Sequence, residues 1–289
     1  MSIMEEYGNM ARYHTGILTL ISTFGVSVFI LCPFWLRIFD IVWPANEVRP
    51  HSWIHIPTEY FIDQEKYYYF IVLHTNVAFC VGSTALVAVG TTSMSYFLHI
   101  CGMFKVASYR VEQAMMICKL EVGSAGSETL IHKQIVCAID MHRKATWSIR
   151  YFISKLQVFY FLLLLCTVIS ISLNLFRIFQ IVTSGFDFEK LVIPCICLGS
   201  LKLYIVIANN NAQQVMDHNE DMFVTVYNVK WYNAPLRIQK MILFMLQRGS
   251  KPFYVIIGGM FIGSLESAAK LLSASMSYFT VLYSTRQNI

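Results

Sequence analysis

Near the end of the chain, two charged side chains and several hydroxyl groups interrupt an otherwise apolar stretch. Glu266 and Lys270 lie in the middle of residues 251–285, where most other side chains are hydrophobic or small. Each charge would cost about 2.5–3.5 kcal/mol at the centre of a bilayer. The hydroxyl groups around them belong to Ser264, Ser267, Ser273, Ser275 and Ser277. This mixture predicts that at least one face of the stretch meets protein or water.

Two interpretations of this stretch follow from its residues. An ordinary final transmembrane helix would neutralise its own charges, because Glu266 and Lys270 are i, i+4 neighbours. The alternative is a two-part helix whose outer half lines a pathway. As one straight helix the stretch would be about 50 Å long against a hydrocarbon core of about 30 Å. It must therefore project or break, and we place the break at the low-propensity residues 273–275. Gly259 and Gly263 form a GxxxG pattern that predicts close approach of another backbone.

The chain lacks the patterns that usually mark enzymes and cofactor-binding proteins. It contains no GxxxxGK[ST], HExxH, CxxC or GxSxG. His51 and His55 are i, i+4 neighbours, but no acidic or thiol partner lies in register with them. We therefore predict no metal site, no cofactor and no enzyme activity. The absence of these motifs favours a protein that binds a ligand or conducts a solute.

Composition places the chain in the membrane class. Hydrophobic residues make up 56% of the 289 residues and charged residues only 13%, and the mean hydropathy is +0.54. These values predict an integral membrane protein. The net charge of +5 does not indicate a nucleic-acid partner, because Lys and Arg cluster between the apolar spans.

Five apolar spans are long enough to cross a bilayer. They are residues 16–39, 67–104, 151–176, 191–215 and 252–284. An odd number of spans places the two termini on opposite sides. Lys and Arg are concentrated near the N-terminus, between the second and third spans, and between the fourth and fifth. The positive-inside rule therefore predicts a cytoplasmic N-terminus and an outer C-terminus.

The spans divide the chain into three regions. Residues 1–104 hold the first two spans and an outer loop, 43–66, whose prolines and aromatic residues predict a lid over the outer mouth. Residues 105–250 hold the third and fourth spans with long cytoplasmic helical extensions, one of them an amphipathic helix capped by Ser127. Residues 251–289 form the final helix and an outer C-terminus.

The outer halves of the first, second and fourth spans offer a set of side chains that would suit a small apolar ligand. They are Val28, Phe29, Trp35, His74, Ala78, Val81, Cys195 and Gly199. His74 would supply one hydrogen bond to the ligand. Packing between helices explains most of this set equally well, and a lone histidine such as His74 is more often a hydrogen-bonded packing residue.

Short motifs follow one another in the C-terminal third in a specific order and spacing. They are Tyr227, Trp231-Tyr232, Gln239, Leu246-Gln247-Arg248 with Lys251-Pro252, Gly258-Gly259, Ser264-Leu265-Glu266, and Ser277-Tyr278-Phe279 with Val281-Leu282. His142 and residues 57–69 add to them upstream. Together they resemble the insect odorant receptor family, and within it the large, divergent receptors of ants and related insects.

The resemblance implies an all-α, polytopic membrane helical bundle with seven helices and a cytoplasmic N-terminus. The five spans would match the third to seventh helices of that fold, with the cytoplasmic extensions as an anchor region. The first two helices would be missing, so we expect an N-terminally truncated receptor.

The resemblance also implies a function, an odorant-binding, ligand-gated, non-selective cation channel. Such a receptor subunit would form a heterotetramer with a shared odorant coreceptor, surrounded by lipid in the dendritic plasma membrane of olfactory sensory neurons. Val281 would fall at the apolar constriction of the pore, with Leu282 or Thr285 as a second position. A gustatory-receptor-like channel and a nonfunctional receptor fragment remain as alternatives. A secondary transporter would show internal repeats, and a metabotropic receptor would have the opposite orientation.

Overall fold

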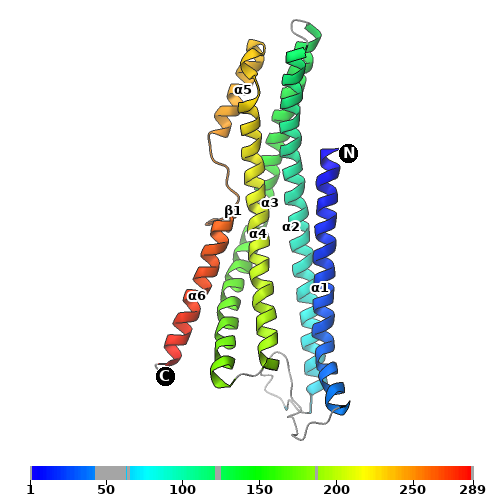
Figure 1. Cartoon of the computed structure of the whole chain (residues 1–289), viewed down its shortest axis with the longest axis vertical. Helices are drawn as coiled ribbons and strands as arrows, with labels where there is room; N and C mark the ends of the chain where they lie inside the picture. Colours follow the sequence, from blue (N-terminus) through cyan, green and yellow to red (C-terminus); the bar gives the residue numbers. More distant parts are fainter. Residues whose placement is uncertain (1, 43–62, 64–65, 121–124, 186–187, 288–289) are drawn as a thin grey trace. The chain divides into compact units, whose positions relative to one another are not determined.

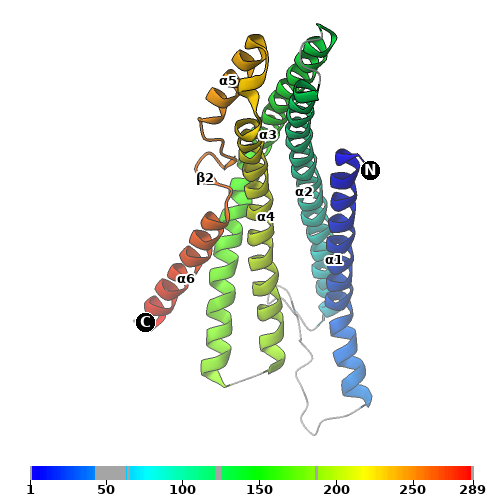
Figure 2. The same ribbon diagram turned by 45° about the horizontal axis from the view of Figure 1, so that its top comes forward.

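The computed structural model describes residues 2–42, 63, 66–120, 125–185 and 188–287. Helices dominate this part of the chain, as predicted (Figures 1 and 2). They are α1 (Ile3–Val42), α2 (Tyr68–Leu120), α3 (Ala125–Ser184), α4 (Phe188–Asn228), α5 (Leu236–Gly249) and α6 (Leu265–Gln287), with a 3-10 turn at Trp231–Asn233. The predicted lid 43–66, including His51 and His55, lies almost entirely outside the described residues.

Four of the described helices, α1 to α4, are long and apolar enough to cross a membrane. With 53 and 60 residues, α2 and α3 would measure about 80 Å and 90 Å, nearly three times the hydrocarbon core. Both helices are therefore much longer than a single crossing requires. The fifth predicted span contributes α6, which is not among those four helices.

The chain forms two compact units, and the smaller one comprises Asn9–Ser95. Here α1 runs beside the first half of α2 (Figure 1). The ring of Phe29 stacks on that of Phe79 with centroids 4.0 Å apart. Near the other end, the hydroxyl groups of Thr15 and Ser95 share a hydrogen bond of 3.3 Å. Aromatic and hydroxyl contacts thus pair the two helices within this unit.

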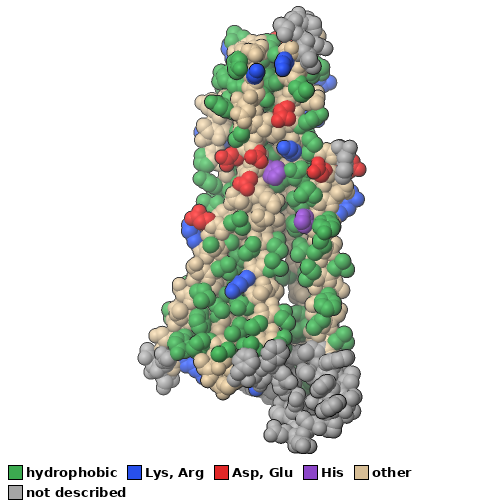
Figure 3. All heavy atoms as spheres, in the orientation of Figure 1, with side chains coloured by type: hydrophobic (Ala, Val, Ile, Leu, Met, Phe, Trp, Pro, Cys, Tyr) green, Lys and Arg blue, Asp and Glu red, His purple; other side chains and the backbone are tan. Residues whose placement is uncertain are grey.

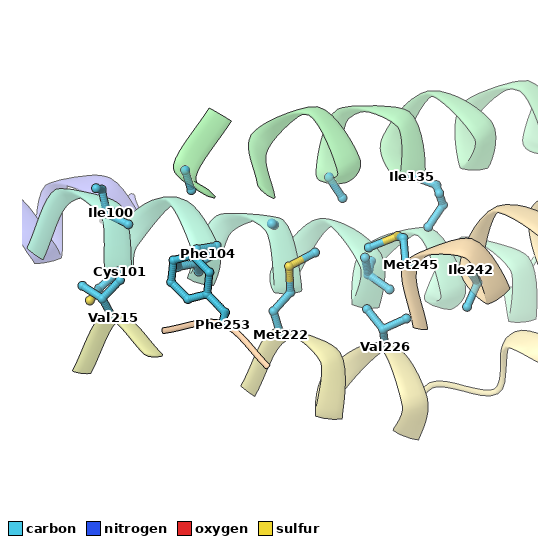
Figure 4. Packing of buried hydrophobic residues seen from close by; sticks show 14 of the residues in the cluster. Ile100, Cys101, Phe104, Ile135, Val215, Met222, Val226, Ile242, Met245 and Phe253 are labelled. Atoms are coloured by element: carbon cyan, nitrogen blue, oxygen red, sulfur yellow. The ribbon is translucent and has the colours of Figure 1, made fainter. Parts of the chain in front are cut away.

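The larger unit, residues 1–8 and 96–289, is built on a core that joins several helices. Figure 4 shows Ile100 and Phe104 of α2 facing Val215 and Met222 of α4, with Phe253 of the segment after α5 between them. Phe104 and Met222 are completely buried. Because the cluster draws on α2, α3, α4 and α5, it fixes these extensions against one another.

A second, smaller core lies where α6 meets α3 and α4. It consists of Val168, Ile171, Ile205, Ala268 and Leu271. Each of these side chains is less than a tenth exposed. Hydrophobic burial therefore fixes the start of α6 on the membrane part of the bundle.

The final apolar stretch breaks at a different place from the one predicted. A two-stranded antiparallel hairpin, β1 (Ile256–Ile257) and β2 (Phe261–Ile262), precedes α6. Its turn contains Gly258 and Gly259 with φ values of 64° and 75°, a conformation that glycine adopts without steric cost. The predicted break at residues 273–275 is wrong, because α6 runs through them without interruption.

The GxxxG pattern has a different role from helix–helix packing, because its glycines lie outside α6. Gly263 is nevertheless a place of close approach. A Cβ atom on Gly263 would lie 2.5 Å from the Cβ of Ala212 in α4. The predicted close approach of another segment is present, but it occurs between α4 and the end of the hairpin and not between two helices.

The first residues of α1 are part of the larger unit and contact α2 and α4 there. The hydroxyl of Tyr7 lies 2.7 Å from Nε2 of His218 in α4. Nδ1 of His218 lies 2.8 Å from the carbonyl oxygen of Gln214, so this nitrogen donates and Nε2 of the neutral ring accepts from Tyr7. A Cβ atom on Gly102 of α2 would lie 3.3 Å from the Tyr7 side chain, so a small residue accommodates this contact.

Candidate functional site

The helix α6 begins at a serine cap that precedes an exposed ion pair. The backbone N–H of Ser267 donates to Oγ of Ser264 over 3.1 Å, which satisfies one of the free donors of the first turn. Lys270 Nζ lies 2.6 Å from Glu266 Oε1, and both side chains are more than 70% exposed. The two charges that stood out in the sequence therefore neutralise each other on the outside of α6.

One face of α6 packs on α3. Ser172 Oγ in α3 donates a hydrogen bond of 3.0 Å to the backbone carbonyl of Ser275, which is completely buried. The rings of Phe279 and Tyr283 meet the ring of Phe179 edge-on, with centroids 6.0 Å and 4.7 Å apart. Because these residues of α6 recur every fourth position, they define one face of the helix.

The opposite face of α6 carries hydroxyl groups and is exposed. Its members are Glu266, Lys270, Ser273, Ser277, Thr280 and Ser284, which we call the hydroxyl stripe. At about 100° per residue they occupy a sector of about 80°, roughly half a turn from Ser275.

The exposed oxygen atoms of hydroxyl groups in the stripe can still accept hydrogen bonds. Oγ of Ser277 donates to the carbonyl of Ser273 and Oγ1 of Thr280 to that of Ser277, over 3.2 Å and 2.7 Å. Since these two hydroxyls donate within their own helix, their oxygen lone pairs remain to accept from water or to face a cation. An exposed row of such acceptors on a membrane helix suits an aqueous path.

The three predicted pore residues differ in their place on α6. Val281 is 62% exposed and lies about 60° from the centre of the hydroxyl stripe. Thr285 and Leu282 lie about 100° and 160° from that centre, and Leu282 is 39% exposed. Among the three, Val281 is the apolar side chain that borders the stripe.

The predicted ligand-binding residues in the smaller unit occupy more than one helix face. They are Val28, Phe29, His74, Ala78 and Val81. His74, Ala78 and Val81 follow i, i+4, i+7 spacing and form one exposed face of α2. Phe29 of α1 instead stacks on Phe79, about 140° around α2 from His74. The α1–α2 pairing therefore does not bring Phe29 to the His74 face.

The remaining predicted residues lie on α4 and at the end of α1. Cys195 and Gly199 of α4, in the larger unit, are exposed and follow the buried Pro194 within the helix. Val28 is 48% exposed on α1. The side chain of Trp35 lies outside the described residues.

A groove of about 820 Å³ runs between α4, the segment after α5 and the start of α6. Asp217, Glu220 and Glu266 line it together with Lys251 and Lys270. Figure 3 shows charged side chains concentrated over the half of α4 nearest α5, while the half beside α6 is mainly hydrophobic. This groove could not be predicted from the sequence, because its walls come from segments far apart in the chain.

A partly buried polar pair in the larger unit was also not predicted from the sequence. Nε2 of His142 in α3 lies 3.0 Å from Oδ1 of Asn219 in α4. The rings of Phe104 and Phe223 lie 5.4 Å and 5.1 Å from the imidazole. The signal in the sequence was a lone histidine in an amphipathic segment, which identifies neither its partner nor its burial.

These structural features indicate the general class of the protein. Several helices that are long and apolar enough to cross a bilayer describe a multi-pass membrane protein. A sequence profile described as 7tm Odorant receptor matches residues 1–276. The chain therefore belongs to the odorant receptor family, which is a family of receptors and not of enzymes.

Individual relatives agree with this assignment. Putative odorant receptor 85d of Drosophila melanogaster is 22% identical over 286 residues, which cover 96% of this chain and 64% of that receptor. Odorant receptor 10 of Aedes albopictus is 31% identical over 72 residues, 25% of this chain and 19% of that receptor. The chain thus spans less than two thirds of the length of the Drosophila relative.

Solved structures show the same fold. The olfactory receptor OR5 of Machilis hrabei in complex with eugenol superimposes with a TM-score of 0.77 at 17% identity, covering 98% of this chain and 68% of that one. A second structure of OR5 gives a TM-score of 0.74 at 16% identity, covering 96% and 67%. The predicted all-α membrane bundle of the insect odorant receptor type is therefore confirmed.

Proposed function

We propose that this chain is an odorant receptor subunit that opens a non-selective cation path when a small volatile molecule binds. It acts with an odorant coreceptor in a heterotetramer, in the dendritic plasma membrane of olfactory sensory neurons and with its N-terminus in the cytoplasm. We further propose that it belongs to the ant-type group, which its motifs resemble, and that its five spans match the third to seventh helices of the family fold.

One observation carries the channel proposal, namely the two faces of α6. A helix surrounded by protein and lipid has no use for a continuous row of hydroxyl groups and a charge pair on its uncovered side. Around a symmetry axis, the same row would line water. Val281 at the border of the stripe supplies an apolar ring where ions are stopped by dewetting.

The ligand class follows from the relatives and from the predicted pocket residues. OR5 of Machilis hrabei is described with eugenol, a small and mostly apolar molecule. Burial contributes about 0.8 kcal/mol per CH2, and micromolar binding corresponds to about 8 kcal/mol. Only the part of that energy that differs between closed and open states opens the channel.

Electrophysiology on cells that co-express this chain with the coreceptor tests the proposal. We expect odorant-evoked cation current and, in Val281→Ser, a raised basal current. The matched control is Met276→Ser, an apolar position of α6 that is 48% exposed, against 62% for Val281, and lies about 140° around the helix from Val281.

Two outcomes contradict the proposal. Unchanged leak and rectification in Val281→Ser would remove Val281 from the constriction. A complex that reaches the cell surface without any odorant-evoked current, while a version extended by two upstream family helices conducts, would identify the chain as a nonfunctional receptor fragment.

A further inference from the structure

One face of α3 changes from basic and aromatic to apolar within about one turn. Trp147, Tyr151 and Lys155 recur every fourth residue and therefore share this face. Trp147 is 64% and Tyr151 50% exposed. Beyond Lys155 the same side of the helix presents exposed aliphatic residues, namely Val158, Leu162, Leu165, Ile169 and Leu173. Such a change is typical of a helix that leaves the hydrocarbon and enters the headgroup layer.

The aromatic residues and the lysine form an ordered cluster. The rings of Trp147 and Tyr151 are stacked, with centroids 5.2 Å apart and planes inclined by 13°. The ammonium of Lys155 lies 5.4 Å from the centroid of the Tyr151 ring. About 100° around α3 from Tyr151, the guanidinium of Arg150 lies 5.8 Å from the centroid of the buried Phe253 ring. We call Trp147, Arg150, Tyr151 and Lys155 the interfacial cluster.

The cations of this cluster lack acidic neighbours. Among the described residues, Arg150 and Lys155 form no ion pair with a carboxylate. One to two turns earlier, Arg143 and Lys144 share the carboxylate of Asp140 over 2.8 Å each. Four cations and one carboxylate therefore precede the apolar part of α3, and a run of four or more basic residues next to a span is typical of anionic lipid binding.

The height of the cluster agrees with a membrane surface. From Lys155 to Arg177, the next charged residue of α3, the helix rises about 33 Å, close to a hydrocarbon thickness of about 30 Å. Tyr151 and Trp147 then lie about 6 Å and 12 Å beyond that edge, within and just outside the headgroup layer. Tyrosine and tryptophan prefer this level because their rings are apolar and their polar groups remain hydrated.

We propose that the interfacial cluster binds the phosphorylated headgroup of an anionic phospholipid in the cytoplasmic leaflet. Lys155 would contact the phosphate oxygens from this face, since its cation is exposed and without a carboxylate partner. Arg150, about 140° around the helix from Lys155, would add to the positive potential that attracts the lipid. The stacked rings of Tyr151 and Trp147 lie farther from the hydrocarbon than Lys155 and would lie along the outer part of the headgroup. The inference rests on the membrane orientation given under Proposed function, but it needs neither an odorant nor a conducting pore.

Lipid binding to the purified complex tests this inference. The chain and its coreceptor are placed in nanodiscs of phosphatidylcholine that contain fluorescent phosphatidylinositol 4,5-bisphosphate or phosphatidylserine, and energy transfer from Trp147 and other tryptophans is recorded. We expect Arg150→Gln/Lys155→Gln to weaken binding about thirtyfold, because each basic residue near an anionic surface contributes about a factor of five. Binding of the parent protein should fall as salt rises.

Two controls keep the test decisive. Arg237→Gln/Lys240→Gln removes the same charge from exposed positions of α5 and should leave binding unchanged. Lys155→Gln alone keeps the contact of Arg150 with Phe253 and should weaken binding about fivefold, so a folding defect does not produce the effect.

Three results would overturn the inference. They are equal binding by the parent and the double variant, equal transfer from labelled phosphatidylcholine, and loss of the heterotetramer in Lys155→Gln. The last result would assign the cluster to a subunit interface. Odorant-evoked current measured in parallel separates these results from failure of the proposed function.

Discussion

At the residue scale, the larger unit contains a polar pair where the surrounding core is aromatic. His142 and Asn219 satisfy each other between the rings of Phe104 and Phe223. A buried polar group that lost this partner would cost about 1–3 kcal/mol. The pair therefore specifies how α3 and α4 align within the larger unit.

The protonation of His142 makes stability depend on pH. Burial lowers the pKa of His142 below its ordinary value of about 6.5, the hydrogen bond with Asn219 acts in the opposite direction, and the charge of Arg248 lowers it further. His142 precedes the span 151–176. As pH falls below about 6.5 the unfolded chain binds more protons than the folded one, so stability falls with pH.

Thermal unfolding of the detergent-purified complex at pH 7.5, 6.5 and 5.5 measures this effect. We expect Tm to decrease on acidification in the parent and to decrease less in His142→Gln, whose amide keeps a hydrogen bond to Asn219. His99→Gln, at an exposed position of α2, serves as the control. Parallel pH profiles of the parent and His142→Gln would contradict the assignment.

Gly258 is a residue whose backbone conformation decides the position of α6. It has a φ of 64°, and an added Cβ atom would lie 2.9 Å from Cδ2 of Phe161. Gly258→Ala should cost at least about 1–2 kcal/mol from the left-handed backbone alone, which corresponds to a Tm lower by about 2–8 °C.

The matched control for this prediction is Gly82→Ala. Gly82 is helical and has no heavy atom within 4 Å of its added Cβ, so alanine should leave Tm unchanged or raise it. Equal Tm values for Gly258→Ala and the parent would show that the turn is not needed.

At the scale of elements, the sequence predicts the long helices well and the division of the last stretch poorly. Uninterrupted apolar runs identify α2 and α3, because the apolarity of a segment depends on its own residues alone. The predicted cap residue Ser127 lies within α3, which begins at Ala125. The adjacent Gly258-Gly259 is a turn signal, but the surrounding isoleucines and phenylalanines hide it within an apolar run. Ser275 looked like its serine neighbours, although it faces α3 and Ser277 does not.

The hairpin before α6 tests whether close packing on α4 sets the position of the final helix. Gly263→Ala would bring its Cβ to 2.5 Å from that of the buried Ala212, so we expect a loss of about 1–3 kcal/mol. Ala212→Gly removes the obstructing methyl group but costs about 1 kcal/mol in helix propensity.

A double-mutant cycle measured by thermal unfolding isolates the contact. The pair Gly263→Ala/Ala212→Gly should be more stable than the sum of the single changes predicts, by about 0.5 kcal/mol or more. Strict additivity of the two changes would place the hairpin away from α4.

At the scale of the whole molecule, the proposed ligand site was harder to predict than the proposed pore lining. The hydroxyl stripe follows from the spacing of serines and threonines along one helix, so its periodicity is visible in the sequence. The predicted ligand-binding residues come from three helices, and their pairing depends on tertiary contacts such as Phe29 with Phe79. That stacking turns Phe29 to a different face of α2 from His74, which spacing within a single helix does not reveal.

The count of membrane crossings gives a final test, because two criteria disagree about α6. By length and apolarity four of the described helices qualify, and an even number would place both termini on one side. The positive-inside distribution and the five predicted spans place them on opposite sides. With 23 residues, α6 is about 34 Å long and would reach across the hydrocarbon core.

The hydroxyl stripe accounts for the low hydropathy of α6, and we predict that α6 nevertheless crosses the membrane. The polar side of α6 would face water within an assembly, so the mean hydropathy of the helix understates its ability to cross a membrane. With epitope tags at both ends, we expect antibodies to label the C-terminal tag on intact cells and the N-terminal tag only after permeabilisation. Both tags hidden until permeabilisation would mean that α6 does not cross, and the hydroxyl stripe would then line a cytoplasmic surface and no pore.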